Sequence, residues 1–227
     1  MKRLLFAGAV IGLLAGAAVS LPLSWVAGER LDALDPDAAA LGTVWDGHVA
    51  HIAGLPPIHT RVRGTDVAVE ADGAGLTLDG TAGPSGITDM SLATPVRALS
   101  RFDPRLTGLA GDVSATDVTL RFEDGGCVEG SGTARTDALS RNAAAWSWRG
   151  PELSGPVTCE DGAVVVTMSG EEAGAGVQAR VEIDPAGIYT TTVDIRTAQP
   201  EAAALLPLLG FQRQSTGCRL QENGRWQ

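Results

Sequence analysis

The chain has 227 residues, of which 44% are hydrophobic and 19% charged, and its formal net charge is −10. This length allows one sizeable core or two small ones, and the apolar content excludes an intrinsically disordered chain. A protein this acidic is repelled by nucleic acids, so nucleic acid is excluded as a partner.

The N-terminal segment from Leu4 to Ala27 carries no charged residue. At 1.5 Å per residue, a helix of this length crosses a hydrocarbon core of about 30 Å. Lys2 and Arg3 precede the segment, and this positive charge predicts a cytoplasmic N-terminus. The alternative is a cleaved signal peptide with residues 18–20 (AVS) as its cleavage site. Both interpretations export the rest of the chain.

Alternating apolar and polar residues, typical of strands with one apolar face, recur through the rest of the sequence. The clearest runs are Val67–Glu70, Leu76–Asp79, Val118–Phe122, Val164–Met168 and Val177–Ile183. The last run is followed by Asp184-Pro185-Ala186-Gly187 and then by IYTTTVDI, which predicts a hairpin. The 29 glycines also favour many turns.

We therefore expect a mainly β protein with two parts. Residues 1–28 would be the cytoplasmic N-terminus and transmembrane anchor, and residues 29–227 a periplasmic β-rich domain. That domain would be a curved, mostly antiparallel β-sheet with one or two short helices. The helix candidates are Thr94–Arg101 and Pro200–Leu209; the second begins with proline and is followed by glycine.

The three histidines, His48, His51 and His59, are the first candidates for a metal site. On a strand, His48 and His51 are an odd number of residues apart, so they point to opposite faces and cannot bind one ion together. Nearby glycines and β-branched residues argue against a helix. His59 is isolated behind the break at Leu55-Pro56-Pro57. The sequence therefore predicts no metal site.

No catalytic arrangement is found in the sequence. A Ser or Cys nucleophile needs a base within reach, and there is no G-x-S-x-G elbow. The acidic pairs Glu123-Asp124 and Glu160-Asp161 lie beside glycines, a pattern typical of solvated turns. Ala71–Gly75 could suggest a phosphate-binding loop, but it has no lysine and no following helix. We predict neither enzymatic activity nor a cofactor.

The three cysteines, Cys127, Cys159 and Cys218, would reach an oxidising compartment after export. None forms a C-x-x-C pair, so the usual spacing for zinc or thioredoxin-like chemistry is missing. We predict a disulfide between Cys127 and Cys159, which would contribute on the order of 3 to 4 kcal/mol. Pairing of Cys159 with Cys218 is the alternative. If the first pairing forms, Cys218 is free or bonded to another chain.

The tryptophans are interpreted first as packing residues. Trp45, Trp146 and Trp148 would pack in the core or on a sheet face, and Trp226 would close the last strand. In this interpretation, residues 42–52 (GTVWDGHVAHI) form the opening strand of the sheet, with Trp45 packed and glycines shaping the ends of the strand. A second interpretation places the tryptophans on an apolar face that a lipid or protein partner covers.

Several of these residues resemble the type II secretion system protein N family. An anchor ending in LPxSW is matched by the residues LPLSW at positions 21–25, and a G-T-x-W-x-G signature by Gly42, Thr43, Trp45 and Gly47. The run CEDGAVVV, the following strand pair, the segment PEAAALLPLLG and a final strand also fit. The family's Gly/Leu-rich strand ending in W-x-L is replaced here by LPPIHTRVRG.

The resemblance implies a non-enzymatic accessory component of a type II protein secretion system. It would be a single-pass protein of the bacterial inner membrane with its C-terminal domain in the periplasm. Its partners would be other type II secretion proteins, and the motif residues would be structural, since the family has no known catalytic residues. The alternative function is a periplasmic protein that binds a lipid or another hydrophobic ligand on the apolar face of a curved sheet.

Overall fold

The computed structural model describes residues 39–43, 45–50, 56–73, 75–101, 106–143, 148, 150–199, 204 and 206–225. The predicted anchor, His51, Trp146 and Trp226 lie outside these residues. Among the residues described, no helix is long and apolar enough to cross a membrane. The chain divides into two compact units, Met1–Ala74 (unit 1) and Gly75–Gln227 (unit 2). The amino-acid composition does not change at this boundary, so the sequence did not predict it.

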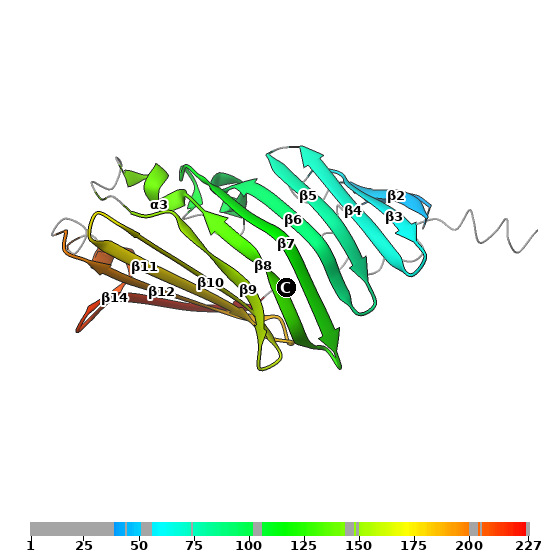
Figure 1. The fold of residues 1–227 in the computed structure, drawn as a ribbon. Coiled ribbons are helices and arrows are strands. Elements are labelled where there is room, and N and C mark those ends of the chain that lie inside the picture. The colour runs from blue at the N-terminus through cyan, green and yellow to red at the C-terminus, as the bar shows by residue number, and fades with distance from the viewer. Residues whose placement is uncertain are drawn as a thin grey trace, which may run out of the picture. The chain divides into compact units, whose positions relative to one another are not determined.

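The described part of unit 1 consists of four strands, each antiparallel to the next (Figure 1). They are β1 (Ala39–Gly42), β2 (Asp46–Ala50), β3 (Ile58–Arg63) and β4 (Asp66–Gly73). Val49, Ile58 and Ala71 are neighbours across β2, β3 and β4 on an apolar face. Because successive side chains alternate, His48 and His59 lie on the opposite, polar face.

The described part of unit 2 contains ten strands in an open antiparallel sheet (Figure 1). Their spatial order follows the chain, except that β13 lies outside β14. Within this unit the sheet curves, so that β9 to β14 run at an angle to β5 to β8. The strands are β5 (Leu76–Gly83), β6 (Gly86–Pro95), β7 (Asp112–Glu123), β8 (Gly126–Thr136), β9 (Leu153–Glu160), β10 (Ala163–Glu172), β11 (Ala175–Ile183), β12 (Ile188–Thr197), β13 (Gln212–Gln214) and β14 (Gly217–Arg225).

Helices are short in unit 2: η1 (Val96–Arg101), α3 (Ala138–Arg141) and η3 (Leu206–Leu209). The first falls within the predicted helix Thr94–Arg101, whose first two residues instead end β6. The third coincides with the end of the predicted helix Pro200–Leu209, half of which lies outside the described residues. The sequence did not predict α3. A mainly β fold with a curved antiparallel sheet and few helices is confirmed.

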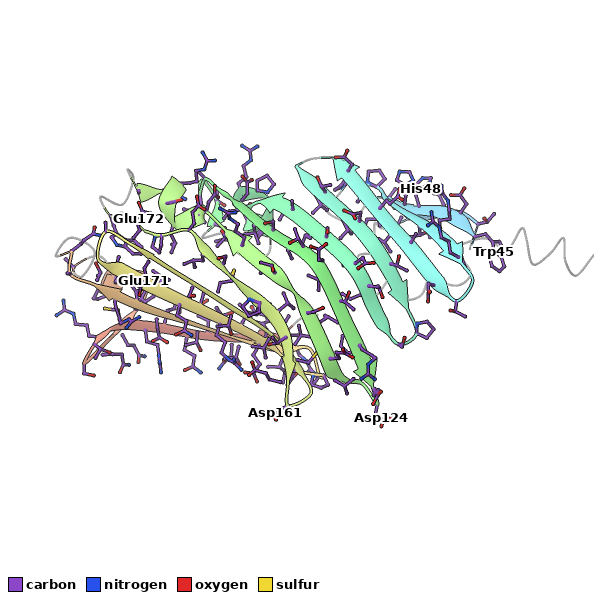
Figure 2. All side chains as sticks on the ribbon, viewed as in Figure 1. Trp45, His48, Asp124, Asp161, Glu171 and Glu172 are labelled. Carbon is purple, nitrogen blue, oxygen red and sulfur yellow. A yellow bond between two sulfur atoms is a disulfide. The ribbon has the colours of Figure 1, made fainter. Side chains whose placement is uncertain are left out.

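Two-residue turns join several strands of unit 2. Asp124 and Gly125 have φ angles of 49° and 82°, and Asp161 and Gly162 have φ angles of 50° and 84°. Positive φ at both central residues is typical of the type I′ turn, whose twist matches that of the flanking strands. Figure 2 shows Asp124 and Asp161 at the tips of their hairpins. The aspartate of each acidic pair is therefore a turn residue, as predicted, whereas Glu123 and Glu160 are the last residues of β7 and β9.

Two buried apolar clusters stabilise unit 2, and each well-buried large side chain contributes about 1.5 to 3 kcal/mol. The first consists of Trp148, Leu153, Ala175, Val177, Ala179, Ile195, Leu206 and Cys218. The second consists of Val118, Leu120, Cys127, Ala134 and Val157. Trp148 is 4% exposed, which confirms its prediction as a packing residue, although it lies in a bend and not on a strand.

The predicted disulfide between Cys127 and Cys159 is present, with a Cα–Cα distance of 5.4 Å. It joins β8 to β9 beyond the stretch in which Thr133–Thr136 pairs with Leu153–Pro156. The bond therefore connects the two strands where their regular ladder has ended. Cys218 is a free thiol that is buried on β14, so it is not positioned to bond to another chain.

Candidate functional site

The G-T-x-W-x-G residues form a tight turn between β1 and β2. Gly42 has a φ of 88°, and a Cβ added there would lie 2.8 Å from Asp46 O, so only glycine fits. The Thr43 N–H donates to Asp46 O over 3.0 Å, and the Asp46 N–H donates to Thr43 Oγ1 over 3.2 Å. These bonds close the turn between β1 and β2.

This turn corrects two expectations about residues 42–52. They do not form one opening strand, because the chain reverses at Thr43–Asp46 and β2 begins only at Asp46. Trp45 is not packed, since it is 43% exposed at the tip of this hairpin. Figure 2 shows its side chain projecting at the end of unit 1.

His48 and His59 are brought together across β2 and β3, a contact that the sequence analysis did not predict. They are direct cross-strand partners, and their ring centroids lie 5.8 Å apart with an interplanar angle of 38°. Glu70 on β4 is the cross-strand partner of His59 on the same face. In the described part of the chain, no group of three or more His, Cys, Asp or Glu side chains is arranged to hold a metal ion.

An ion-pair network lies across the polar face of β9, β10 and β11. Arg180 on β11 donates to Glu160 on β9 over 2.8 Å and to Glu182 over 3.3 Å. Because β10 pairs with both β9 and β11, the bond to Glu160 passes over β10, and Val165 on that strand is fully buried. The hydrogen bond from Arg180 lowers the pKa of the Glu160 carboxyl below its ordinary value. The charged side chains of this network thus pair with one another inside unit 2.

A second charged contact organises the segment between β8 and β9. Asp137 accepts a hydrogen bond from the Arg141 guanidinium over 2.8 Å and one from the Asp112 N–H over 2.7 Å. These bonds, with Arg141 contributing most, lower the pKa of Asp137. The buried Asn142 amide donates to Ala110 O over 2.8 Å, so this segment is attached to the loop before β7.

The outer edge of β14 is only partly covered by a neighbouring strand. On one side β14 pairs with β12 over Ile195 to Ile188, along almost its whole length. On the other side β13 covers only Gly217–Arg219. In the part of the chain that the structure describes, no strand pairs with the outer edge of residues 220–225.

The described hollows do not favour the lipid-binding alternative. One is lined by Pro95, Arg97 and the loop 108–112, and a second by the turn 171–176 with Arg196. A third lies at the β13–β14 turn. None of the three is lined by the apolar residues in the middle of β10, so these three hollows give no support to a groove for a hydrophobic ligand.

A family model described as type II secretion system (T2SS), protein N matches residues 51–221, most of the chain. Neither the curated proteins nor the solved structures contain a match. The matched segment begins after the turn at Gly42–Gly47, so the role of that turn as a family signature stays a prediction. The family is a secretion-system accessory family that is not known as enzymatic. The chain belongs to the type II secretion system protein N family.

Proposed function

We propose that the protein is a non-enzymatic accessory component of a type II secretion system, held in the inner membrane by residues 4–27. Its β domain lies in the periplasm and contacts other secretion components through the outer edge of β14. Family membership supports the secretion role. The observation that carries the contact site is that, among the described strands, none pairs with Gln221, Asn223 and Arg225 on the side away from β12.

The turn between β13 and β14 determines which backbone groups this edge offers. Gln214 and Gly217 flank a two-residue loop, so they form a hydrogen-bonded pair. Hydrogen-bonding direction alternates along an antiparallel strand, so the N–H and C=O groups of Gln221, Asn223 and Arg225 point away from β12. An extended segment of a partner adds a strand to such an edge by main-chain hydrogen bonds.

The side chains along the edge are of the kind expected on a surface that is exposed to water when no partner is bound. Gln221, Asn223 and Arg225 are exposed, and all three are polar. A long unpaired apolar edge would favour aggregation, whereas polar side chains on an edge reduce that risk. The edge is thus suited to reversible contact.

The disulfide and the sequence of the first 28 residues support the proposed location. Structural disulfides persist in oxidising compartments such as the periplasm and are rare in the cytosol. Carbonate extraction should leave the full-length chain in the membrane fraction, and protease added to spheroplasts should degrade the β domain. A mature chain that begins near residue 21, identified by mass spectrometry, would contradict the anchor.

The contact is tested by removing one outward N–H without disturbing the pairing with β12. Asn223→Pro does this, because proline lacks the donor and is tolerated on an edge strand. Asn223→Thr is the matched control, since it changes the side chain but keeps the N–H. After mild crosslinking in cells, we expect the wild type and Asn223→Thr to co-purify secretion components and Asn223→Pro to recover much less. Equal recovery by both variants would contradict the proposed edge.

A further inference from the structure

On the polar face of unit 1, the imidazoles of His48 and His59 lie directly across from each other on neighbouring strands. The Val62 N–H donates to Trp45 O over 3.0 Å, so these two residues belong to a hydrogen-bonded pair of the β2–β3 ladder. Hydrogen-bonded and non-hydrogen-bonded pairs alternate in an antiparallel ladder, so His48 and His59 form a non-hydrogen-bonded pair. Side chains approach most closely at such positions, with Cβ atoms about 4.5 to 5.5 Å apart.

The separation of the rings suits two ligands of one ion. Imidazole nitrogens bind zinc at about 2.0 to 2.1 Å, which places two rings on one ion with their centres roughly 5 to 6 Å apart. The ring centroids of His48 and His59 are 5.8 Å apart. The distance between the two rings is therefore compatible with one nitrogen of each ring binding a shared ion.

The surroundings of the pair favour a cation with open coordination positions. His59 is exposed and His48 is half-buried, so water can complete the coordination shell. Glu70 adds a negative charge on the same face next to His59. The charged pair nearest to the histidines on this face is Asp46 opposite Arg61, which is neutral in sum.

We propose that His48 and His59 form a two-histidine site for a borderline divalent transition-metal ion such as Zn²⁺, Ni²⁺ or Cu²⁺, with Glu70 increasing its affinity. Neutral imidazole is a preferred ligand of these ions. The site is independent of the secretion role and of the β14 edge. A bound ion links β2 to β3, so it stabilises unit 1 by binding the folded state preferentially.

The test is a titration of the full-length protein in detergent with ZnCl₂ and with NiCl₂, purified through a tag that contains no histidine. Isothermal titration calorimetry should show one ion bound per chain. His48→Asn and His59→Asn should each weaken binding about tenfold or more. The control is His51→Asn, which changes the remaining histidine of the chain and should leave the affinity unchanged.

A second measurement distinguishes this site from unspecific binding by the many carboxylates. Zn²⁺ should slow hydrogen exchange of amides in β2 and β3 in the wild type and in His51→Asn, but not in His48→Asn. No binding by the wild type, equal weakening by all three histidine variants, or protection spread over both units would overturn the proposal.

Discussion

Units 1 and 2 are both built by antiparallel pairing of sequential strands, but they differ in how much they bury. The strands of unit 1 have four to eight residues, whereas β5 to β12 have eight to twelve. Buried apolar residues in the described part of unit 1 are small, namely Val49, Pro56, Ala68 and Ala71. Unit 2 has two apolar clusters, a disulfide and a network of ion pairs.

This difference in burial suggests that the two units differ in stability. Burial and covalent linkage should make unit 2 the more stable body. The proposed binding of a partner at the open edge of β14 would not require this body to unfold. Unit 1 has exposed Leu41 and Trp45 and a histidine pair on its surface, with less burial to stabilise it. Local opening free energies should therefore be lower in unit 1 than in unit 2.

Of the changes considered, removing the disulfide should have the largest effect on the difference in stability between the units. Replacing Cys127 and Cys159 together by serine should lower the free energy of unfolding of unit 2 by about 3 to 4 kcal/mol, because the unfolded chain loses its cross-link. Hydrogen exchange should become faster in β7 to β9 and remain unchanged in β2 to β4. Cys218→Ala, which removes an unbonded thiol, is the control and should cost much less. Equal losses would contradict the stabilising role of the disulfide.

Asn142→Leu should have the next largest effect, again confined to unit 2. The buried amide donates to Ala110 O and Ala138 O and accepts from the Ala110 N–H. Leucine leaves these groups without partners, which should cost about 2 to 3 kcal/mol. Urea unfolding measures the loss. Ser140→Ala, which removes a single hydroxyl bond to Asp137 O, should cost clearly less.

Gly42→Ala should weaken unit 1 and leave unit 2 unaffected. The positive φ and the clash of a Cβ with Asp46 O together should cost about 2 kcal/mol. Gly64→Ala is the matched comparison, because Gly64 also has a positive φ, of 68°, but a Cβ there meets nothing within 4 Å. Faster exchange at β1 and β2 for Gly42→Ala than for Gly64→Ala is expected. The reverse order would show that the turn is not tightly closed.

Asp137→Asn should have the smallest effect and the clearest dependence on pH. The pKa of Asp137 is lowered from 3.8 in the folded protein, so its charge stabilises the fold above that value. This contribution is lost as the pH falls through the lowered folded pKa. At pH 7 the variant should be about 1 kcal/mol less stable than the wild type, since one charge-assisted bond to Arg141 is weakened. A difference that grows on acidification would contradict this role.

Period-two alternation, with the hairpin turn after Ile183, predicted half of the strands of unit 2, namely β5, β7, β10, β11 and β12, because Val177–Ile183 and similar runs have one apolar face. β3 was not predicted, although Ile58 and Val62 lie on one face of it and His59, Arg61 and Arg63 on the other. The contact of His48 with His59 could not be read from spacing, since it depends on the register that the connection between β2 and β3 sets. The open edge of β14 likewise depends on the short length of β13.

Site-specific photo-crosslinking in cells that carry the complete secretion system tests the proposed function most directly. A photoreactive residue at position 221 or 223, on the outer edge of β14, should form adducts with other secretion components. The same residue in place of Ser169, which is exposed in the middle of the sheet on β10, should form few. Adducts of equal yield at both places, or none from the edge, would contradict a scaffold that binds its partners through this strand.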